Sequence, residues 1–140
     1  MSDPIFRGGL DRPTLAGLGR LLDRLAAAAV AAGVADAPRR KLLLAADELV
    51  SNVLNHREGR DRPRVSLTLS RSGGGLRLEI EDDGPRFDPF AVADPETDLS
   101  LEERPIGGLG LLLVRTLAAE GRYERRGERN RVVLDFSGAP

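Results

Sequence analysis

Two stretches of strict two-residue alternation constrain the fold of this chain more than any other feature. Apolar residues alternate with serine and threonine over Val65–Leu69, and with charged residues over Leu76–Ile80. The run Ser72-Gly-Gly-Gly75 between them is typical of a turn. Alternation places the apolar side chains on one face of each strand. We therefore expect an antiparallel hairpin that buries one face.

Two amphipathic helices are expected before this hairpin. Leucine and alanine recur at helical spacing from Thr14 to Ala32, and Gly33 follows as a C-cap. The second helix is expected from about Pro38 to His56, after an N-cap supplied by Asp36. Its apolar residues form one stripe and its polar residues another. The polar stripe carries Lys41, Glu48, Asn52 and Asn55.

The second half of the chain predicts a long loop, a third helix and a second hairpin. Periodicity disappears from Pro85 to Ile106, and a loop of about 20 residues in a compact domain is usually functional, for example as a cover over a ligand. A leucine-rich helix is expected after this loop and ends at Gly121, and a last hairpin turns near Gly127. Before the first helix, Ile5-Phe6-Arg7 gives little alternation, so any strand there is expected to be short or irregular.

This order of elements favours an α+β fold. We expect a two-layer α/β sandwich with a mainly antiparallel sheet and helices packed on one face. A chain of 140 residues fits one domain, so residues 1–140 are expected to form a single unit.

Composition bounds the classes of function. The chain has 21 Lys and Arg against 22 Asp and Glu and no cysteine, so neither a nucleic-acid partner nor a disulfide framework is favoured. No apolar run approaches the roughly 20 residues that span a bilayer, and no signal peptide is expected. We expect a cytoplasmic protein without a membrane segment. The arginines between Arg122 and Arg131 are either solvated charges or a patch for an acidic partner.

Glu48 and Asn52 are four residues apart, so their side chains project from the same face of the second helix. An amide oxygen is a suitable ligand for Mg²⁺, which usually keeps several waters beside substrate phosphates. Glu48 would then be free to act as a general base. The alternative is an ordinary solvated helix face, and the spacing alone does not decide between them.

Asp82 and Gly84 form an Asp-x-Gly motif at the end of an apolar strand. A buried carboxylate needs a donor, which the exocyclic amine of adenine can provide, and glycine lets the backbone approach a ring closely. Alternation with Leu78 and Ile80 points Asp82 inward rather than Asp83. The same motif is also an ordinary strand-ending turn.

A glycine-rich turn precedes the third helix. Gly107, Gly108 and Gly110 would leave backbone N–H groups and the positive end of the helix dipole facing the loop, which suits a phosphate. The alternative is that glycines occur at these positions because the turn packs closely against the rest of the protein, without a ligand. His56, the one histidine, either continues the polar stripe or stabilises the helix end as a cation.

Taken together, these segments resemble a known family. Ala45–His56, Ile80–Pro89 and Gly107–Leu117 are similar, in this order, to the N, G1 and G2 boxes of the GHKL ATPases, whose fold is the Bergerat type. The resemblance extends over nearly the whole chain. It is closest to the stand-alone anti-sigma factor serine/threonine kinases of bacteria.

The resemblance implies a role for each motif. Asn52 would hold Mg²⁺ on the ATP phosphates, and Glu48 would take the proton of the attacking hydroxyl. Asp82 would accept from the adenine amine, and Gly84 would leave room for the ring. Residues 85–106 would form the ATP lid. The backbone N–H groups that would bind phosphate belong to Gly108, Leu109 and Gly110.

The resemblance also implies partners. The substrate would be a serine or threonine of a STAS-fold antagonist protein, in a partner-switching pathway that releases a sigma factor from a kinase homodimer. A nucleotide-binding module that sequesters a partner with little or no kinase activity is the alternative. The family often has a threonine near the last strand that reaches adenine through water, but this chain reads Arg129-Asn-Arg131 there, and that contact is left unassigned.

Overall fold

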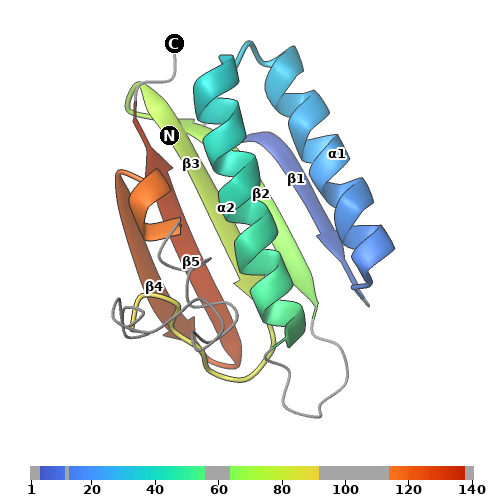
Figure 1. Ribbon diagram of the computed structural model, residues 1–140. Coiled ribbons are helices and arrows are strands. Elements are labelled where there is room, and N and C mark those ends of the chain that lie inside the picture. Colours follow the sequence, from blue (N-terminus) through green and yellow to red (C-terminus); the bar gives the residue numbers. More distant parts are fainter. Residues whose placement is uncertain (1–3, 12, 56–63, 92–113, 138–140) are drawn as a thin grey trace, which may run out of the picture.

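A five-stranded antiparallel sheet forms one layer of the molecule, and two long helices form the other (Figure 1). The structure is a computed structural model, and it describes residues 4–11, 13–55, 64–91 and 114–137. The strand order is β1-β2-β3-β5-β4, with every neighbouring pair antiparallel. The strands are β1 Pro4–Leu10, β2 Val65–Ser72, β3 Gly75–Asp82, β4 Glu120–Arg126 and β5 Arg129–Phe136. The predicted two-layer α+β sandwich is confirmed.

The two helices cover one face of the sheet. Helix α1 spans Leu15–Ala31 and α2 spans Asp36–Asn55, within a few residues of the predicted bounds. Thr14 caps α1, because its Oγ1 accepts from the Gly17 N–H at 2.9 Å. Gly33 follows α1 with a φ of +81°, a conformation that glycine adopts at low cost. None of the described helices is long and apolar enough to cross a bilayer.

The core lies between the helices and the inner face of the sheet. Leucine side chains of both layers fill it, and the alternating residues of β2 and β3 supply the sheet side as predicted. The largest fully buried leucines are Leu21, Leu25, Leu42, Leu67, Leu69, Leu76, Leu78 and Leu134. On the opposite face, β2 and β3 carry charged and small polar side chains such as Ser66, Arg77 and Glu79. The two-residue period therefore predicted which side of β2 and β3 faces the helices.

The amino-terminal strand is longer than the sequence predicted. β1 has seven residues and pairs with β2, with a register shift only between Pro4 and Phe6. Two consecutive glycines permit this close pairing: a Cβ on Gly9 would lie 2.7 Å from the Val65 carbonyl oxygen. The strand is held by its backbone pairing with β2, which an alternation pattern cannot report.

The third helix ends earlier than predicted. Residues 114–117 are helical, but Gly121 lies in β4 and pairs with Leu134 instead of ending the helix. A Cβ on Gly121 would lie 2.7 Å from the Phe90 ring, so this glycine serves close packing between β4 and the segment after β3. The last hairpin turns at Gly127, as expected, with a φ of +56°.

Candidate functional site

Three of the predicted site residues line one small cavity between α2 and the end of β3. Asn52 comes from α2, and Asp82 and Gly84 come from the end of β3 and the turn after it. The cavity has a volume of about 20 Å³, the room of roughly one water molecule. Its other lining residues are Val53, Pro85, Phe87 and Asn130. The structure thus brings the Asn52 amide and the Asp82 carboxylate to one cavity from two separate segments of the chain.

The alternation of β3 places Asp82 in this cavity. The inward residues Leu78 and Ile80 are buried, and Asp82, two positions further along, is 8% exposed. Asp83 is exposed, and its Oδ1 accepts from the Arg64 N–H at 2.7 Å. The inward carboxylate is therefore Asp82, as the sequence predicted.

Within the described ranges, one oxygen of the Asp82 carboxylate receives all of its hydrogen bonds. Its Oδ1 accepts from the Gly84 N–H at 2.9 Å and from Asn130 Nδ2 at 3.0 Å. No described residue donates to Oδ2. Burial raises the pKa of Asp82, and the hydrogen bonds from Asn130 and Gly84 oppose this rise. A buried carboxylate with one free oxygen can accept from an N–H group of a ligand.

Asn130 is a site residue that the sequence did not assign. It lies on β5 directly opposite Asp82 in the β3–β5 pairing and is 2% exposed. Its side chain bonds to the Asp82 carboxylate, to the turn after β3 and to β4. An amide in line with the apolar inward residues Val132, Leu134 and Phe136 was the signal that could have found it.

Glu48 lies one helical turn before Asn52 on α2, and both are half-buried. The residues that line the cavity include Asn52 but not Glu48. Glu48 is therefore adjacent to the site along the helix. A group that reacts with it has to approach from outside the cavity.

Several predicted site residues lie outside the part of the chain that the structure describes. They are His56, Gly107, Gly108, Leu109 and Gly110, together with the loop from position 92 to Ile106. Their predicted roles stay predictions.

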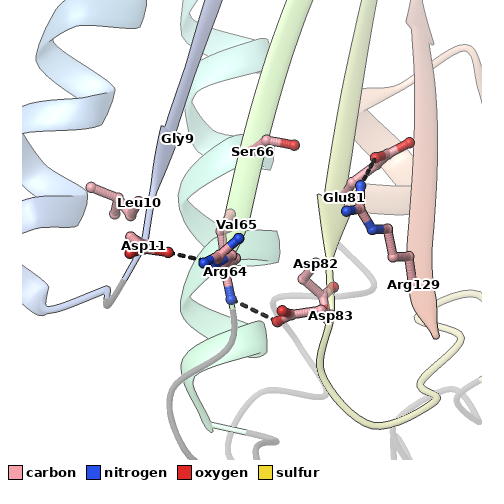
Figure 2. Close-up of a pocket in the computed structure, with 10 residues that line it drawn as sticks. All are labelled: Gly9, Leu10, Asp11, Arg64, Val65, Ser66, Glu81, Asp82, Asp83 and Arg129. Carbon is pink, nitrogen blue, oxygen red and sulfur yellow. Dashed lines mark hydrogen bonds and ion pairs between the residues drawn. The ribbon is translucent and has the colours of Figure 1, made fainter.

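A larger cavity of about 400 Å³ lies where β1, β2, β3 and β5 meet at one end of the sheet (Figure 2). Its charged side chains pair with one another: Arg64 Nε lies 2.6 Å from Asp11 Oδ1, and Arg129 Nη1 lies 3.8 Å from Glu81 Oε2. Among the predicted site residues it includes only Asp82. The smaller cavity at α2 is therefore the better candidate for the predicted site.

The histidine kinase-like ATPase domain matches this chain over residues 12–136. The chain belongs to this family. A serine/threonine-protein kinase, BtrW of Bordetella bronchiseptica, is 33% identical over 103 residues, which cover 73% of this chain and 72% of the relative. The resemblance to the GHKL ATPases is thereby confirmed.

A solved structure has the same fold. The crystal structure of the RsbU and RsbW domains of Rv1364c from Mycobacterium tuberculosis matches with a TM-score of 0.66 at 14% identity. The match covers 96% of this chain but only 33% of that one, so this chain corresponds to about a third of the solved protein. At this identity the likeness concerns the fold.

Family membership makes ATP the ligand against which the cavity has to be tested. The chemistry fits: Asp82 Oδ2 is a free acceptor, Gly84 has no side chain to block a ring, and Asn52 brings an amide to the same cavity. The volume does not fit in this conformation, because an adenine ring is larger than one water.

The arginines of the last hairpin of this ATPase domain are matched by acidic or carbonyl partners. Arg131 lies 2.8 Å from Glu79, Arg122 lies 3.7 Å from Asp135, and Arg126 pairs with Glu124. Arg125 donates to the carbonyl oxygens of Gly84 at 2.9 Å and Gly127 at 3.1 Å. The structure favours charges neutralised within the protein over a patch for an acidic partner.

Proposed function

We propose that this protein is an ATP-dependent serine/threonine kinase of the anti-sigma factor type, which phosphorylates a STAS-fold antagonist protein in a partner-switching pathway. The observation that carries the proposal is the meeting of Asn52, Asp82 and Gly84 around one cavity. The curated relative named as a serine/threonine-protein kinase supports the reaction class. We place this activity in the cytoplasm.

Each residue has a distinct role in this proposal. The free Oδ2 of Asp82 accepts from the adenine amine, and Gly84 leaves space for the ring. Asn52 would provide an amide oxygen to hold Mg²⁺, which would supply positive charge to stabilise the phosphates during transfer. The backbone of Gly108, Leu109 and Gly110 donates to phosphate, and the loop that begins at Pro85 closes over the nucleotide.

Glu48 acts as the general base of the transfer step. The substrate hydroxyl oxygen forms a bond to the γ-phosphorus, the bond from that phosphorus to the β–γ bridging oxygen breaks, and the hydroxyl proton passes to the Glu48 carboxylate. ADP leaves with the bridging oxygen. The position of Glu48 beside the cavity suits a hydroxyl that arrives on a second protein.

A nucleotide-binding module with little or no kinase activity is the second candidate. The observation that favours it is that Glu48 does not line the cavity that Asn52 and Asp82 share. Such a module would sequester a sigma factor or another partner in a nucleotide-dependent way. In either case we place the contact of a homodimer near β1, which is an edge strand of the described sheet.

One experiment separates the two candidates. The purified protein is incubated with γ-labelled ATP, Mg²⁺ and STAS-fold proteins from the same genome, and label on a serine or threonine is mapped by mass spectrometry. Transfer to one STAS-fold protein is the result expected for the kinase. Saturable ATP binding without transfer to any of them would select the binding module, and no ATP binding would reject both.

A further inference from the structure

We propose that Asn130 is a positioning residue for nucleotide recognition: its side-chain amide orients the Asp82 carboxylate and fixes the turn Gly84–Phe87 without contacting the nucleotide. The inference rests on the proposed function, because it takes the adenine amine as the donor to Asp82. The new element is a residue on β5 that determines the orientation of the Asp82 carboxylate.

The N–H side of the amide faces acceptors. Asn130 Nδ2 lies 3.0 Å from Asp82 Oδ1 and 2.8 Å from the Pro85 carbonyl oxygen, with the Gly84 carbonyl oxygen at 3.5 Å. Two hydrogen bonds donated by Asn130 Nδ2 thus connect the Asp82 carboxylate to the backbone of the turn that follows it. The same side chain fixes the direction of the carboxylate and the path of the chain after β3.

The oxygen of the amide faces donors. Asn130 Oδ1 accepts from the Phe87 N–H at 3.2 Å, from Tyr123 Oη at 2.6 Å and from Arg125 Nη1 at 3.2 Å. Acceptors surround one end of the amide and donors surround the other, so its orientation is determined by its neighbours. Arg125 Nη1 also donates to the Gly84 carbonyl oxygen at 2.9 Å, which joins β4 to the same turn.

The amide has no capacity left for a ligand. Both N–H groups and both lone pairs of Asn130 are used within the protein. It therefore differs from the threonine that the family often carries in this region, which reaches adenine through water. Asn130 acts through Asp82: by occupying Oδ1 it leaves Oδ2 as the oxygen that accepts from a ligand.

Asn130→Asp tests this arrangement, because it keeps the shape and the acceptor side but replaces the two N–H groups with an oxygen. At a pH high enough to ionise both carboxyl groups, that oxygen lies against Asp82 Oδ1 and the Pro85 carbonyl oxygen and is repelled by both, so the carboxylate can no longer hold its direction. We would measure by calorimetry the affinities for ATP and for purine riboside 5′-triphosphate, which lacks the 6-amino group. The ratio of the two affinities reports the contact of Asp82 with the amine.

We expect Asn130→Asp to discriminate less between ATP and purine riboside triphosphate than the parent protein does. Asn130→Asp should lower the affinity for ATP about tenfold and that for purine riboside triphosphate less than about threefold, so the ratio approaches that of Asp82→Asn. Arg126→Ala, a control at an exposed position of the same hairpin, should keep the parental ratio. If Asn130→Asp also keeps that ratio, even with both affinities lowered, the amide is structural only and the inference is overturned.

A second variant covers the case in which Asn130→Asp does not fold, as judged by circular dichroism. Tyr123→Phe removes the shortest bond to the amide oxygen at a half-buried position, and it should lower the ratio about threefold. An unchanged ratio in that folded variant overturns the inference as well. A parent protein that binds no ATP instead rejects the proposed function, so the two failures are distinguishable.

Discussion

Asn130 Nδ2 donates to Asp82 Oδ1 at 3.0 Å across the β3–β5 pairing, although the two residues are 48 positions apart in the chain. The bond is buried, and it engages the same carboxylate oxygen that accepts from the Gly84 N–H. Asn130 is the one described side chain that donates a hydrogen bond to this carboxylate. Burial raises the pKa of Asp82, whereas these hydrogen bonds and the nearby positive charge of Arg125 lower it.

Replacing Asp82 by Asn should separate recognition from folding. The new side chain has the same shape, and its oxygen can still accept from Gly84 and Asn130, but it presents an N–H donor in place of the acceptor Oδ2. We expect the affinity for ATP to fall by about 1.5–3 kcal/mol, the range for hydrogen bonds to charged groups, with the melting temperature unchanged or raised. Isothermal titration calorimetry and thermal denaturation measure both effects. Unchanged ATP affinity in a folded Asp82→Asn protein would remove the recognition role of this carboxylate.

The stability of the folded protein should depend on pH through the protonation of Asp82. Burial raises the pKa of Asp82 in the folded protein, so the folded chain holds this proton more tightly than the unfolded chain. The stabilisation is complete below the ordinary pKa of an aspartate and is lost as the pH rises through the raised value. The difference in unfolding free energy between Asp82→Asn and the parent should therefore grow in favour of Asp82→Asn as the pH rises through this window.

Nucleotide binding should show the opposite trend with pH. The adenine amine donates to the ionised carboxylate, so the affinity for ATP should fall as the pH drops through the raised pKa of Asp82. Purine riboside triphosphate controls for protonation of the phosphates, since it carries the same triphosphate without the amine. If the affinities for the two nucleotides fall in parallel as the pH is lowered, Asp82 does not titrate in contact with the amine.

The sequence predicted the inward side of β2 and β3 and the two hairpins, but not the pairing of β3 with β5. The two-residue period was enough to separate Asp82 from Asp83, because that choice depends only on the face of one strand. Asn130 was missed because its importance depends on register, which sets it opposite Asp82 and beside Tyr123 and Arg125. A periodicity describes one segment at a time, whereas this cluster joins β3, β4, β5 and a turn.

The same limit explains why the length of β1 and the end of the third helix were not predicted. β1 has weak alternation of its own, yet its pairing with β2 and the close approach at Gly9 hold it in place. Gly121 looked like a helix end, but it belongs to a strand in which a larger residue would collide with Phe90. In both cases a glycine marks contact with a distant segment, and the local pattern cannot distinguish that use from a terminator.

Arg131 should contribute more to stability than the other arginines of its hairpin. Its guanidinium lies 2.8 Å from Glu79, 3.3 Å from Glu124 and 3.5 Å from Glu81, and its side chain is only 18% exposed. Arg131→Ala leaves three neighbouring carboxylates without this cation, so we expect the unfolding free energy to fall by about 1–2 kcal/mol, and by less in high salt.

Arg126→Ala is the matched control for Arg131, because the Arg126 side chain is mostly exposed and its one ion pair with a described residue is to Glu124. It should change the unfolding free energy by less than about 0.5 kcal/mol. Urea denaturation at low and high salt measures both variants. Equal losses for the two arginines would show that the cluster around Arg131 adds nothing beyond an ordinary surface pair.

Glu48 gives the sharpest test of catalysis, since it is near the cavity without lining it. Glu48→Gln keeps the shape of the side chain but cannot take a proton, so phosphoryl transfer to the antagonist protein should fall by about 10²–10⁴-fold, the usual contribution of a general base. The affinity for ATP should change less than about threefold, because the nucleotide contacts belong to other residues. Asp47→Asn removes a neighbouring exposed carboxylate that accepts from Ser51 at 3.2 Å, and it should transfer phosphate at the parental rate. Transfer at that same rate by Glu48→Gln would mean that another group takes the proton, and the half-buried carboxylate of Glu48 would then need a different explanation.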